Sequence, residues 1–284
     1  MRIAYQGEPG AYSEAAALRY AAHAATLPCR TFEAVFAAVR DGAASHGILP
    51  MENSIGGTIH RNFDLLLEHD LPIVGEVELE VDHCLLALPG VSLADVKTVY
   101  SHPQAIAQCE RFLNSLGVEM SAVYDTAGGA KLIVERQQRD GAALASRRAA
   151  DVFGLAILKE GVQDYQANIT RFCLVSRAAA PADQAEKTSV VFALPSQPGS
   201  LFKALSVFAM RDINLTKLES RPIAGRPWEY MFYVDLTTAR QSPECTRALM
   251  HLGEMARWVR TLGSYPAWKP QETVQEAFAG DPLV

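Results

Sequence analysis

Short apolar runs of strand length alternate with segments of helical periodicity from Ile3 to Val175. We expect strands at 3–5, 47–49, 73–81, 84–88, 96–100, 122–124, 142–145, 155–158 and 172–175. Helices are expected from about Ser13, over 32–39, from Ile59 to Leu67 with Thr58 as N-cap, and from Ile106 to Leu116. This regular alternation is typical of an α/β fold.

Residues 178–187, AAAPADQAEK, are small and polar and predict a linker. The order of predicted strands and helices is different after this segment. The order strand, helix, strand, strand, helix, strand follows, over 190–194, 201–208, 213–218, 229–236, 242–255 and 258–262. Ser242 and Pro243 suit the N-cap and first position of the second helix. This order within one domain predicts a ferredoxin-like α+β fold.

Composition indicates an ordinary soluble globular protein with room for two domains. The chain has 284 residues, of which 49% are hydrophobic and 20% charged, and its formal net charge is -6. No Lys/Arg-rich run is present, so nucleic acid and anionic membranes are not expected partners. No apolar run reaches the length of a membrane-spanning helix.

The cysteines and the N-terminus bear on the cellular compartment. Five scattered cysteines without a CxxC pair argue against a disulfide framework or a zinc site. The N-terminal residues lack the apolar region of a signal peptide, so we expect free thiols and a cytoplasmic location. The glycosylation sequon at Asn168 is then expected to be coincidental, because glycosylation requires the secretory route.

Polar residues gather at four places where predicted strands end. These junctions are 7–13, 50–58, 101–104, where Pro103 suits the first helical position and His102 the cap, and 125–128. Free backbone N–H groups at helix starts favour anions, although each junction alone is compatible with an ordinary capped turn. Four junctions together with Arg171 beside Thr170 predict a cleft for a small carboxylate ligand.

Several common kinds of chemistry lack their motifs. The segment GEPGAY does not have dinucleotide-binding GxGxxG spacing, and neither a Walker A loop nor a GxSxG nucleophile elbow occurs. The histidines lack metal-ligand spacing. His102 fits either a catalytic base or a structural cap, and Glu52 fits either a general base or a residue that orients its loop. We therefore expect chemistry without a metal, cofactor or covalent intermediate.

The ordered motifs resemble one known family. The segments PMENSIGGTIHRNFDLLLEHDLPIVGEVELEVDHCLLALPG, SHPQAIAQCERFL, DTAGGA and NITRF resemble the prephenate dehydratase family. PGSLFKAL and LESRP resemble its C-terminal ACT regulatory domain. The resemblance extends from about residue 3 to 268. No helical extension precedes Met1, so the resemblance is to the monofunctional type, which lacks a fused chorismate mutase.

The resemblance implies a particular architecture. The catalytic domain, 1–180, would be bilobal and periplasmic-binding-protein-like (type II), with lobe one about 1–77 and 162–180 and lobe two about 78–161. The chain would cross between the lobes near 75–80 and 160–165, and the substrate would lie in the cleft. An ACT domain at 188–268 and a tail at 269–284 would follow. A tetramer, a dimer of dimers with ACT domains side by side, is also implied.

The activity implied is that of a carbon–oxygen lyase of phenylalanine biosynthesis. It would decarboxylate and dehydrate prephenate to phenylpyruvate without a cofactor, under feedback regulation by L-phenylalanine at the ACT domain. Arogenate dehydratase, with an amino group in place of the substrate's keto oxygen, is an alternative. A non-catalytic amino-acid sensor is a second alternative, which the presence of Thr170 and of Asn53-Ser54 disfavours.

Site residues follow by matching the family's motifs. The catalytic candidates are Thr170, Arg171, Asn53, Ser54, Ser101, His102, Gln108 and Thr126, and the substrate-binding candidates are Phe172, Glu52, Tyr12 and Ser13. We expect Arg171 to bind a carboxylate, because its fork is permanently charged. Thr170 would hydrogen-bond the departing hydroxyl and relay a proton, with His102 a weaker source.

The phenylalanine site is expected in two segments of the ACT domain. The candidates are Gly199, Ser200, Leu201, Asn214, Leu215, Glu219, Ser220, Arg221 and Pro222. Ser200 departs from the family pattern, in which alanine is commoner. Its hydroxyl is expected to change the affinity or selectivity for the effector.

Overall fold

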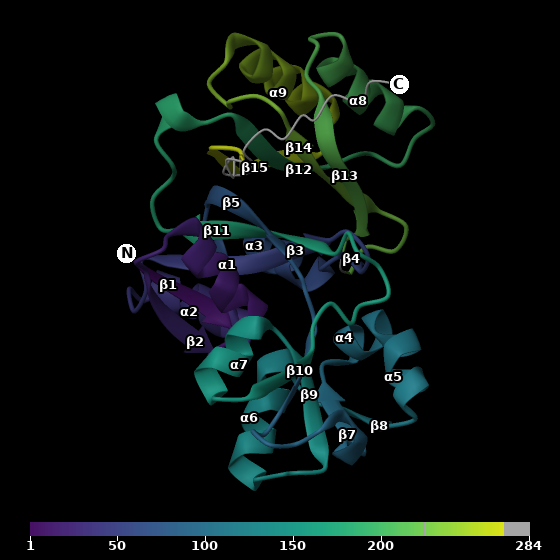
Figure 1. The fold of residues 1–284 in the computed structure, drawn as a ribbon. Helices are drawn as coiled ribbons and strands as arrows, with labels where there is room; N and C mark the ends of the chain where they lie inside the picture. The colour runs from purple at the N-terminus through teal and green to yellow at the C-terminus, as the bar shows by residue number, and fades with distance from the viewer. Residues whose placement is uncertain (224, 270–284) are drawn as a thin grey trace, which may run out of the picture.

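The computed structural model describes residues 1–223 and 225–269. The first lobe contains the strand order β5-β11-β3-β1-β2, with the short β4 paired to β3 (Figure 1). Its elements are β1 (Arg2–Gln6), α1 (Tyr12–Tyr20), β2 (Ala25–Cys29), α2 (Phe32–Arg40), β3 (His46–Asn53), β4 (Gly57–Thr58), α3 (His60–His69), β5 (Ile73–Glu80) and β11 (Ile169–Ser176).

The second lobe is built on a separate five-stranded sheet with the order β10-β6-β9-β7-β8. Its elements are β6 (Cys84–Ala87), β7 (Thr98–Ser101), α4 (Pro103–Gln108), α5 (Glu110–Leu116), β8 (Glu119–Ala122), α6 (Thr126–Arg136), β9 (Gly141–Ala145), α7 (Arg147–Phe153) and β10 (Ala156–Lys159). The chain enters this lobe between Glu80 and Cys84 and leaves it between Lys159 and Ile169.

Small residues let α6 pack closely on this second sheet. Every residue of β9 is buried, and most of them are alanine or glycine. A Cβ atom at Gly129 would lie 2.7 Å from the carbonyl oxygen of Tyr100. The close approach fixes where α6 begins, and therefore where Asp125 and Thr126 lie.

The C-terminal part has the predicted ferredoxin-like order of β12 (Lys187–Ala193), α8 (Ser200–Ala209), β13 (Leu215–Pro222), β14 (Tyr230–Leu236), α9 (Pro243–Met255) and β15 (Trp258–Tyr265). Its strands run β13-β14-β12-β15, and all these pairs are antiparallel. Ser242 caps α9 as predicted, because its side chain accepts the N–H of Cys245. No helix among the described residues is long and apolar enough to cross a membrane.

The C-terminal sheet is covered on both faces. Alternate residues of β12 and β14, such as Val190 and Val234, pack against α8 and α9. Their neighbours Val191 and Tyr233 pack against the first lobe, in a core that includes Leu49 of β3. β15 also pairs with β5 through Gly263 and Ile73, so the two sheets form one ten-stranded sheet that folds back on itself (Figure 1).

Two helix predictions were wrong in detail. Thr58 does not cap α3: it lies in β4 opposite Glu52, and its hydroxyl bonds the side chains of Lys217 and Glu219. The single helix expected from Ile106 to Leu116 is divided at Cys109, which has φ −123° and ψ 21°. The interruption allows the adjacent residues Gln108 and Cys109 both to be buried, against different surroundings.

Smaller shifts occur elsewhere. The strand expected at 122–124 ends at Ala122, because Asp125 is taken up as the cap of α6. The expected linker 178–187 contains a single 3-10 turn at Ala182–Gln184, and β12 already begins at Lys187.

Gly263→Ala should weaken the junction between the two sheets. A Cβ atom there would lie 2.2 Å from the carbonyl oxygen of Ile73, which belongs to the backbone and cannot swing aside. We expect a loss of about 1–3 kcal/mol in the free energy of unfolding, measured by urea denaturation. Gly253→Ala is the matched control: nothing lies within 4 Å of a Cβ on this residue of α9, so it should gain up to about 1 kcal/mol. Equal stability of the two variants would contradict this.

Candidate active site

A cavity of about 560 Å³ lies between the two lobes of the first domain. Five helices begin at its wall, since residues at the starts of α1, α2, α3, α4 and α6 line it. Its polar lining includes Gln6, Tyr12, Ser13, Arg30, Asn53, Arg61, His83, His102, Gln108, Asp125, Thr126 and Thr170, and Phe172 contributes an apolar wall. Helix N-termini carry partial positive charge, so the cavity is suited to an anion.

Asn53 and Thr170 are neighbours across strands β3 and β11 at the cavity. The Asn53 side-chain oxygen accepts the backbone N–H groups of Ile55 at 3.0 Å and Gly56 at 2.7 Å. Backbone N–H groups only donate, so the amide nitrogen of Asn53 must face the Thr170 hydroxyl, 2.9 Å away. Thr170 therefore accepts this bond and keeps its own hydrogen to donate into the cavity.

A buried amide network continues from this pair. Asn53 Nδ2 donates to Asn168 Oδ1 at 2.6 Å, and Asn168 Nδ2 donates to Gln108 Oε1 at 3.0 Å. Asn168 is fully buried. The network links β11 of the first lobe to α4 of the second, and each amide's orientation follows from that of the one before it. These hydrogen bonds fix the position of the Asn53 side chain.

His83 ends the network at the point where the chain crosses between lobes. Its Nε2 lies 3.0 Å from Gln108 Oε1, and its Nδ1 lies 2.9 Å from the Tyr12 hydroxyl. Because Gln108 Oε1 is an acceptor, His83 Nε2 carries a hydrogen. Burial lowers the pKa of His83. The neutral Nε2–H form therefore fits the contact with Gln108. Nδ1 is then unprotonated and competes with the carbonyl oxygen of Asp82, 2.7 Å from the Tyr12 hydroxyl, for the single hydrogen of that hydroxyl.

Two other titratable groups stand at helix starts. His102 caps α4, with Nδ1 accepting the N–H of Gln104 at 3.2 Å, and burial lowers its pKa. Asp125 caps α6: its two oxygens accept the N–H groups of Gly128 and Glu8, and burial raises its pKa. His102 thus occupies the cap position predicted from the sequence.

Eight of the twelve predicted catalytic and substrate-binding residues line the cavity. They are Tyr12, Ser13, Asn53, His102, Gln108, Thr126, Thr170 and Phe172. Ser101 does not line it, since it is fully buried with its hydroxyl donating to the carbonyl of Leu144 at 2.6 Å. The Ser54 hydroxyl also bonds backbone, the carbonyl of Ala167 and the N–H of Ile169. Both serines shape loops around the site.

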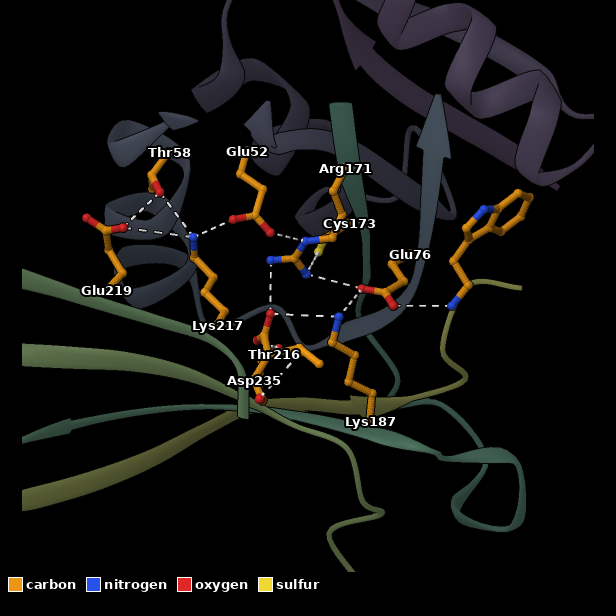
Figure 2. Close-up of polar contacts among 12 residues, drawn as sticks. Glu52, Thr58, Glu76, Arg171, Cys173, Lys187, Thr216, Lys217, Glu219 and Asp235 are labelled. Carbon is orange, nitrogen blue, oxygen red and sulfur yellow. Dashed lines mark hydrogen bonds and ion pairs between the residues drawn. The ribbon is translucent and has the colours of Figure 1, made fainter. Parts of the chain in front are cut away.

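The expected carboxylate partner, Arg171, points away from the cavity. Adjacent residues of a strand face opposite sides, and Arg171 lies on the side opposite Thr170. Its guanidinium contacts Glu52 at 2.5 Å, Glu76 at 3.1 Å and Asp235 at 2.9 Å (Figure 2). With these bonds made, Arg171 is unavailable to a ligand in the cavity, and Glu52 lies on the same far side as its partner.

Sequence reasoning missed Arg30, Arg61, His83 and Asn168. Arg30 follows β2 at the start of α2, a fifth strand–helix junction that was not among the four predicted. His83 stands alone in the sequence, and Asn168 acquires its partners only when β11 lies beside β3. In the sequence Asn168 carried only a coincidental glycosylation sequon and no assigned role.

The predicted effector residues divide into two groups. Ser200 and Leu201 line a second pocket of about 300 Å³ with Trp228, Tyr230 and Phe232. Gly199 caps α8 with φ 79°, a left-handed conformation that favours glycine. Asn214 and the predicted residues of β13, which are Leu215, Glu219, Ser220, Arg221 and Pro222, do not line this pocket. Arg221 instead pairs with Asp64 of α3 at 2.6 Å, and Glu219 accepts a bond from Thr58 at 2.9 Å.

Fold and cavity together define a class of protein. A bilobal, periplasmic-binding-protein-like (type II) domain with a polar interlobe cavity precedes a ferredoxin-like domain of the ACT type. A family model described as prephenate dehydratase matches residues 3–180, and one described as ACT domain matches 188–250. The chain belongs to the prephenate dehydratase family.

Similar proteins carry more than one description. A chain from Arabidopsis thaliana described as arogenate dehydratase/prephenate dehydratase 2, chloroplastic, is 48% identical over 94% of this chain and 73% of its own. A prephenate dehydratase solved in complex with L-Phe, from Arthrobacter aurescens, is 32% identical with a TM-score of 0.84, over 94% of this chain and 90% of that one. GqqA, described as a novel type of quorum quenching acylase, is 39% identical with a TM-score of 0.85, over 94% and 98%.

Stability should depend on pH partly through His83. Because burial lowers its pKa from the ordinary 6.5, the unfolded chain takes up a proton at higher pH than the folded protein does. The contribution of His83 to the free energy of unfolding is therefore complete well above pH 6.5 and falls as pH decreases through that value.

As pH falls from about 7.5 to 5.5, the free energy of unfolding should decrease less in His83→Gln than in the wild type. The reason is that only the wild type has a histidine whose pKa differs between the folded and unfolded states. Urea unfolding at several pH values measures it. The difference at the highest pH reports the lost contacts, and the slope reports the titration. Identical slopes would contradict the expectation.

Proposed function

We propose that this chain catalyses the decarboxylating dehydration of prephenate to phenylpyruvate. The observation that carries the proposal is the Thr170 hydroxyl, which the Asn53 amide fixes as an acceptor at 2.9 Å, so that its hydrogen is directed to another acceptor. A leaving hydroxyl in the cavity is such an acceptor. Membership of the prephenate dehydratase family supports the same reaction class, a lyase reaction.

The reaction needs a proton but no redox partner. The bond between the ring and its carboxylate breaks, CO2 departs, and the electron pair enters the ring. The ring becomes aromatic as the opposite C–O bond breaks, and the hydroxyl leaves with one proton as water. A donor placed at the leaving oxygen lowers this barrier, and such positioned proton transfer typically contributes about 10²–10⁴-fold.

Arg30 replaces Arg171 as the proposed partner for a substrate carboxylate. It lines the cavity beside the start of α2, and no salt bridge joins it to another described residue. Arg61 also lines the cavity, but it is held by Glu33 at 2.9 Å and Glu68 at 2.8 Å. A free guanidinium together with several helix N-termini complements a dianion.

His102 remains the proposed proton source for the Thr170 relay. Its Nδ1 accepts a backbone N–H, so the hydrogen of the neutral ring lies on Nε2 and is available for donation. His83 is less suited, since both of its ring nitrogens already have protein partners. Thr170 would then pass a proton to the leaving hydroxyl rather than ionise itself.

Arogenate is the second candidate substrate. Three relatives that are 48% identical are described as arogenate dehydratases, two of them also as prephenate dehydratases. Arogenate carries an ammonium group where prephenate has a keto oxygen, so its pocket needs an acceptor at that place. Glu33 and Asp125 are the carboxylates among the described residues that line the cavity, and an ammonium group there would share them with their present partners, Arg61 and two backbone N–H groups.

An acylase reaction is less compatible with this site. Hydrolysis through an acyl intermediate needs a nucleophile beside a base. The partner of the Thr170 hydroxyl is an amide that donates to it, and no cysteine is among the described residues that line the cavity.

Regulation by phenylalanine is proposed for the second pocket. The aromatic side chains of Trp228, Tyr230 and Phe232 line it beside Ser200 at the start of α8. An aromatic wall and a helix start suit the ring and the carboxylate of an amino acid. The related prephenate dehydratase from Arthrobacter aurescens was solved in complex with L-Phe. A tetramer of paired ACT domains belongs to the same proposal.

Thr170→Val should lower kcat by about 10²–10⁴-fold, because valine keeps the shape of threonine but cannot donate a hydrogen bond. Thr170→Ser keeps the hydroxyl and should retain most of the activity. Steady-state kinetics with prephenate and with arogenate measure both variants, and the wild-type ratio of kcat/KM identifies the preferred substrate. A folded Thr170→Val protein with near-normal kcat would disprove the role of this hydroxyl.

Arg30→Gln should lower kcat/KM by roughly 10–100-fold, mainly through KM, because a charged hydrogen bond contributes about 1.5–3 kcal/mol. Arg40→Gln is the matched control, since this exposed arginine lies at the far end of α2 and pairs with Asp41. An Arg30 variant with the KM of the control would exclude Arg30 as the carboxylate partner.

A further inference from the structure

The pair at the cavity has a second pair directly behind it. Thr170 pairs with Asn53 in the strand register, and the next residues, Arg171 and Glu52, also pair. Successive side chains alternate between faces, so the first pair faces the cavity and the second faces the ACT domain. A shift of the backbone at the second pair therefore moves the first pair as well, because the two are adjacent on the same strands.

The strands are least regular at this point. The register of β11 against β3 shifts between Arg171 and Phe172, because Phe172 pairs with Pro50 and leaves Met51 as an extra residue. A bulge of this kind interrupts the ladder of backbone hydrogen bonds and bends the strand. The position of Asn53 and Thr170 thus depends more on side-chain contacts than in a regular sheet.

Those contacts form a buried charge cluster of three cations and three anions: Arg171, Lys187, Lys217, Glu52, Glu76 and Asp235 (Figure 2). Three of the four strands of the ACT sheet contribute a member of the cluster: Lys187 from β12, Lys217 from β13 and Asp235 from β14. Lys217 contacts Glu52 at 2.6 Å, and Asp235 contacts Arg171 at 2.9 Å.

Burial makes this cluster sensitive to the loss of any member. Arg171, Glu76, Lys187, Lys217 and Asp235 are each less than 10% exposed. Removal of one partner leaves an uncompensated buried charge, which favours rearrangement of the remaining groups. The groups free to rearrange, Arg171 and Glu52, are attached to the two strands that carry Thr170 and Asn53.

We propose that Asp235 and Lys217 of the ACT domain are positioning residues for the reaction, acting through Arg171 and Glu52 on Thr170 and Asn53. The proposal rests on the proposed dehydratase function and extends it: a docked ACT domain completes the geometry of the catalytic pair.

The same contacts connect the second pocket with the reaction. Tyr230 and Phe232, which line that pocket, lie on β14 together with Asp235. A ligand that shifts β14 therefore shifts the carboxylate that holds Arg171. The charge cluster gives an effector at the ACT domain a route to Thr170 through one strand and one ion pair.

The test compares kcat and KM for Asp235→Asn, Lys217→Met and Lys217→Arg in the full-length protein, with both substrates. We expect the first two to lose about 10²-fold in kcat, the effect of a misplacement of about 1 Å, with KM close to that of the wild type. Lys217→Arg keeps the charge and should restore most of kcat. If Asp235→Asn fails to fold, Lys217→Met still tests the proposal. It leaves Glu52 without its lysine partner, but Glu52 is partly exposed, so water can solvate its charge and the variant should fold.

Asp64→Asn is the matched control. It removes an ion pair with Arg221 between α3 and β13, across the same boundary but away from β3 and β11. The control should keep wild-type activity. A loss in the control equal to that in Asp235→Asn would show a general docking effect and overturn the proposal, as would wild-type kcat in both cluster variants.

Hydrogen exchange separates this proposal from the proposed function. Segments 46–58 and 168–176 should exchange faster in Asp235→Asn and Lys217→Met but not in Asp64→Asn. If the wild type is inactive on both substrates, the proposed function fails while this comparison still decides the positioning role. Unchanged exchange in these segments would overturn that role.

Phenylalanine provides the last comparison. It should slow the wild type at subsaturating substrate, whereas Lys217→Met should still bind phenylalanine by calorimetry but lose most of the inhibition. Full inhibition of that variant would exclude the charge cluster as the route from the second pocket.

Discussion

The alternation of side chains along β3 and β11 separates two sets of polar residues on which the arrangement of the domains depends. On each strand one residue faces the interlobe cavity and its neighbour faces the ACT domain, so Thr170 and Arg171 have different surroundings although they are adjacent. The cavity side is neutral and hydrogen-bonded, and the other side is charged and buried. A slip of one residue in register would exchange the two sets and destroy both.

Polar groups are buried on both sides of these strands, and both sets are paired with groups from other parts of the chain. The amide network reaches Gln108 and His83 of the second lobe, and the charge cluster reaches Lys187, Lys217 and Asp235. Such networks contribute little net stability when compared with apolar packing, but they accept one arrangement only. They therefore specify how the lobes and the ACT domain meet.

The ACT sheet serves as a shared wall. Its outer face packs on α8 and α9, and its inner face packs on the first lobe through Val191 and Tyr233, beside the charge cluster (Figure 1). Because the inner face packs on the first lobe and not against solvent, a shift of these strands changes the contacts made by β3 and β11. The arrangement links the two domains more tightly than a flexible linker would.

Hydrophobic periodicity in the sequence was enough to determine the α/β and ferredoxin-like fold classes, most strands and helices, and the caps of α4 and α9, because these depend on near neighbours. Motif resemblance also placed Thr170, Asn53, Gln108 and Thr126 at residues that line the cavity. Tertiary structure alone decided that Arg171 and Glu52 face the ACT domain, that Asn168 and His83 join the amide network, and that Arg30 reaches the cavity. A residue's type indicates which bonds it can make, but which face of a strand it occupies, and what lies opposite that face, depends on the packing of segments far apart in the chain.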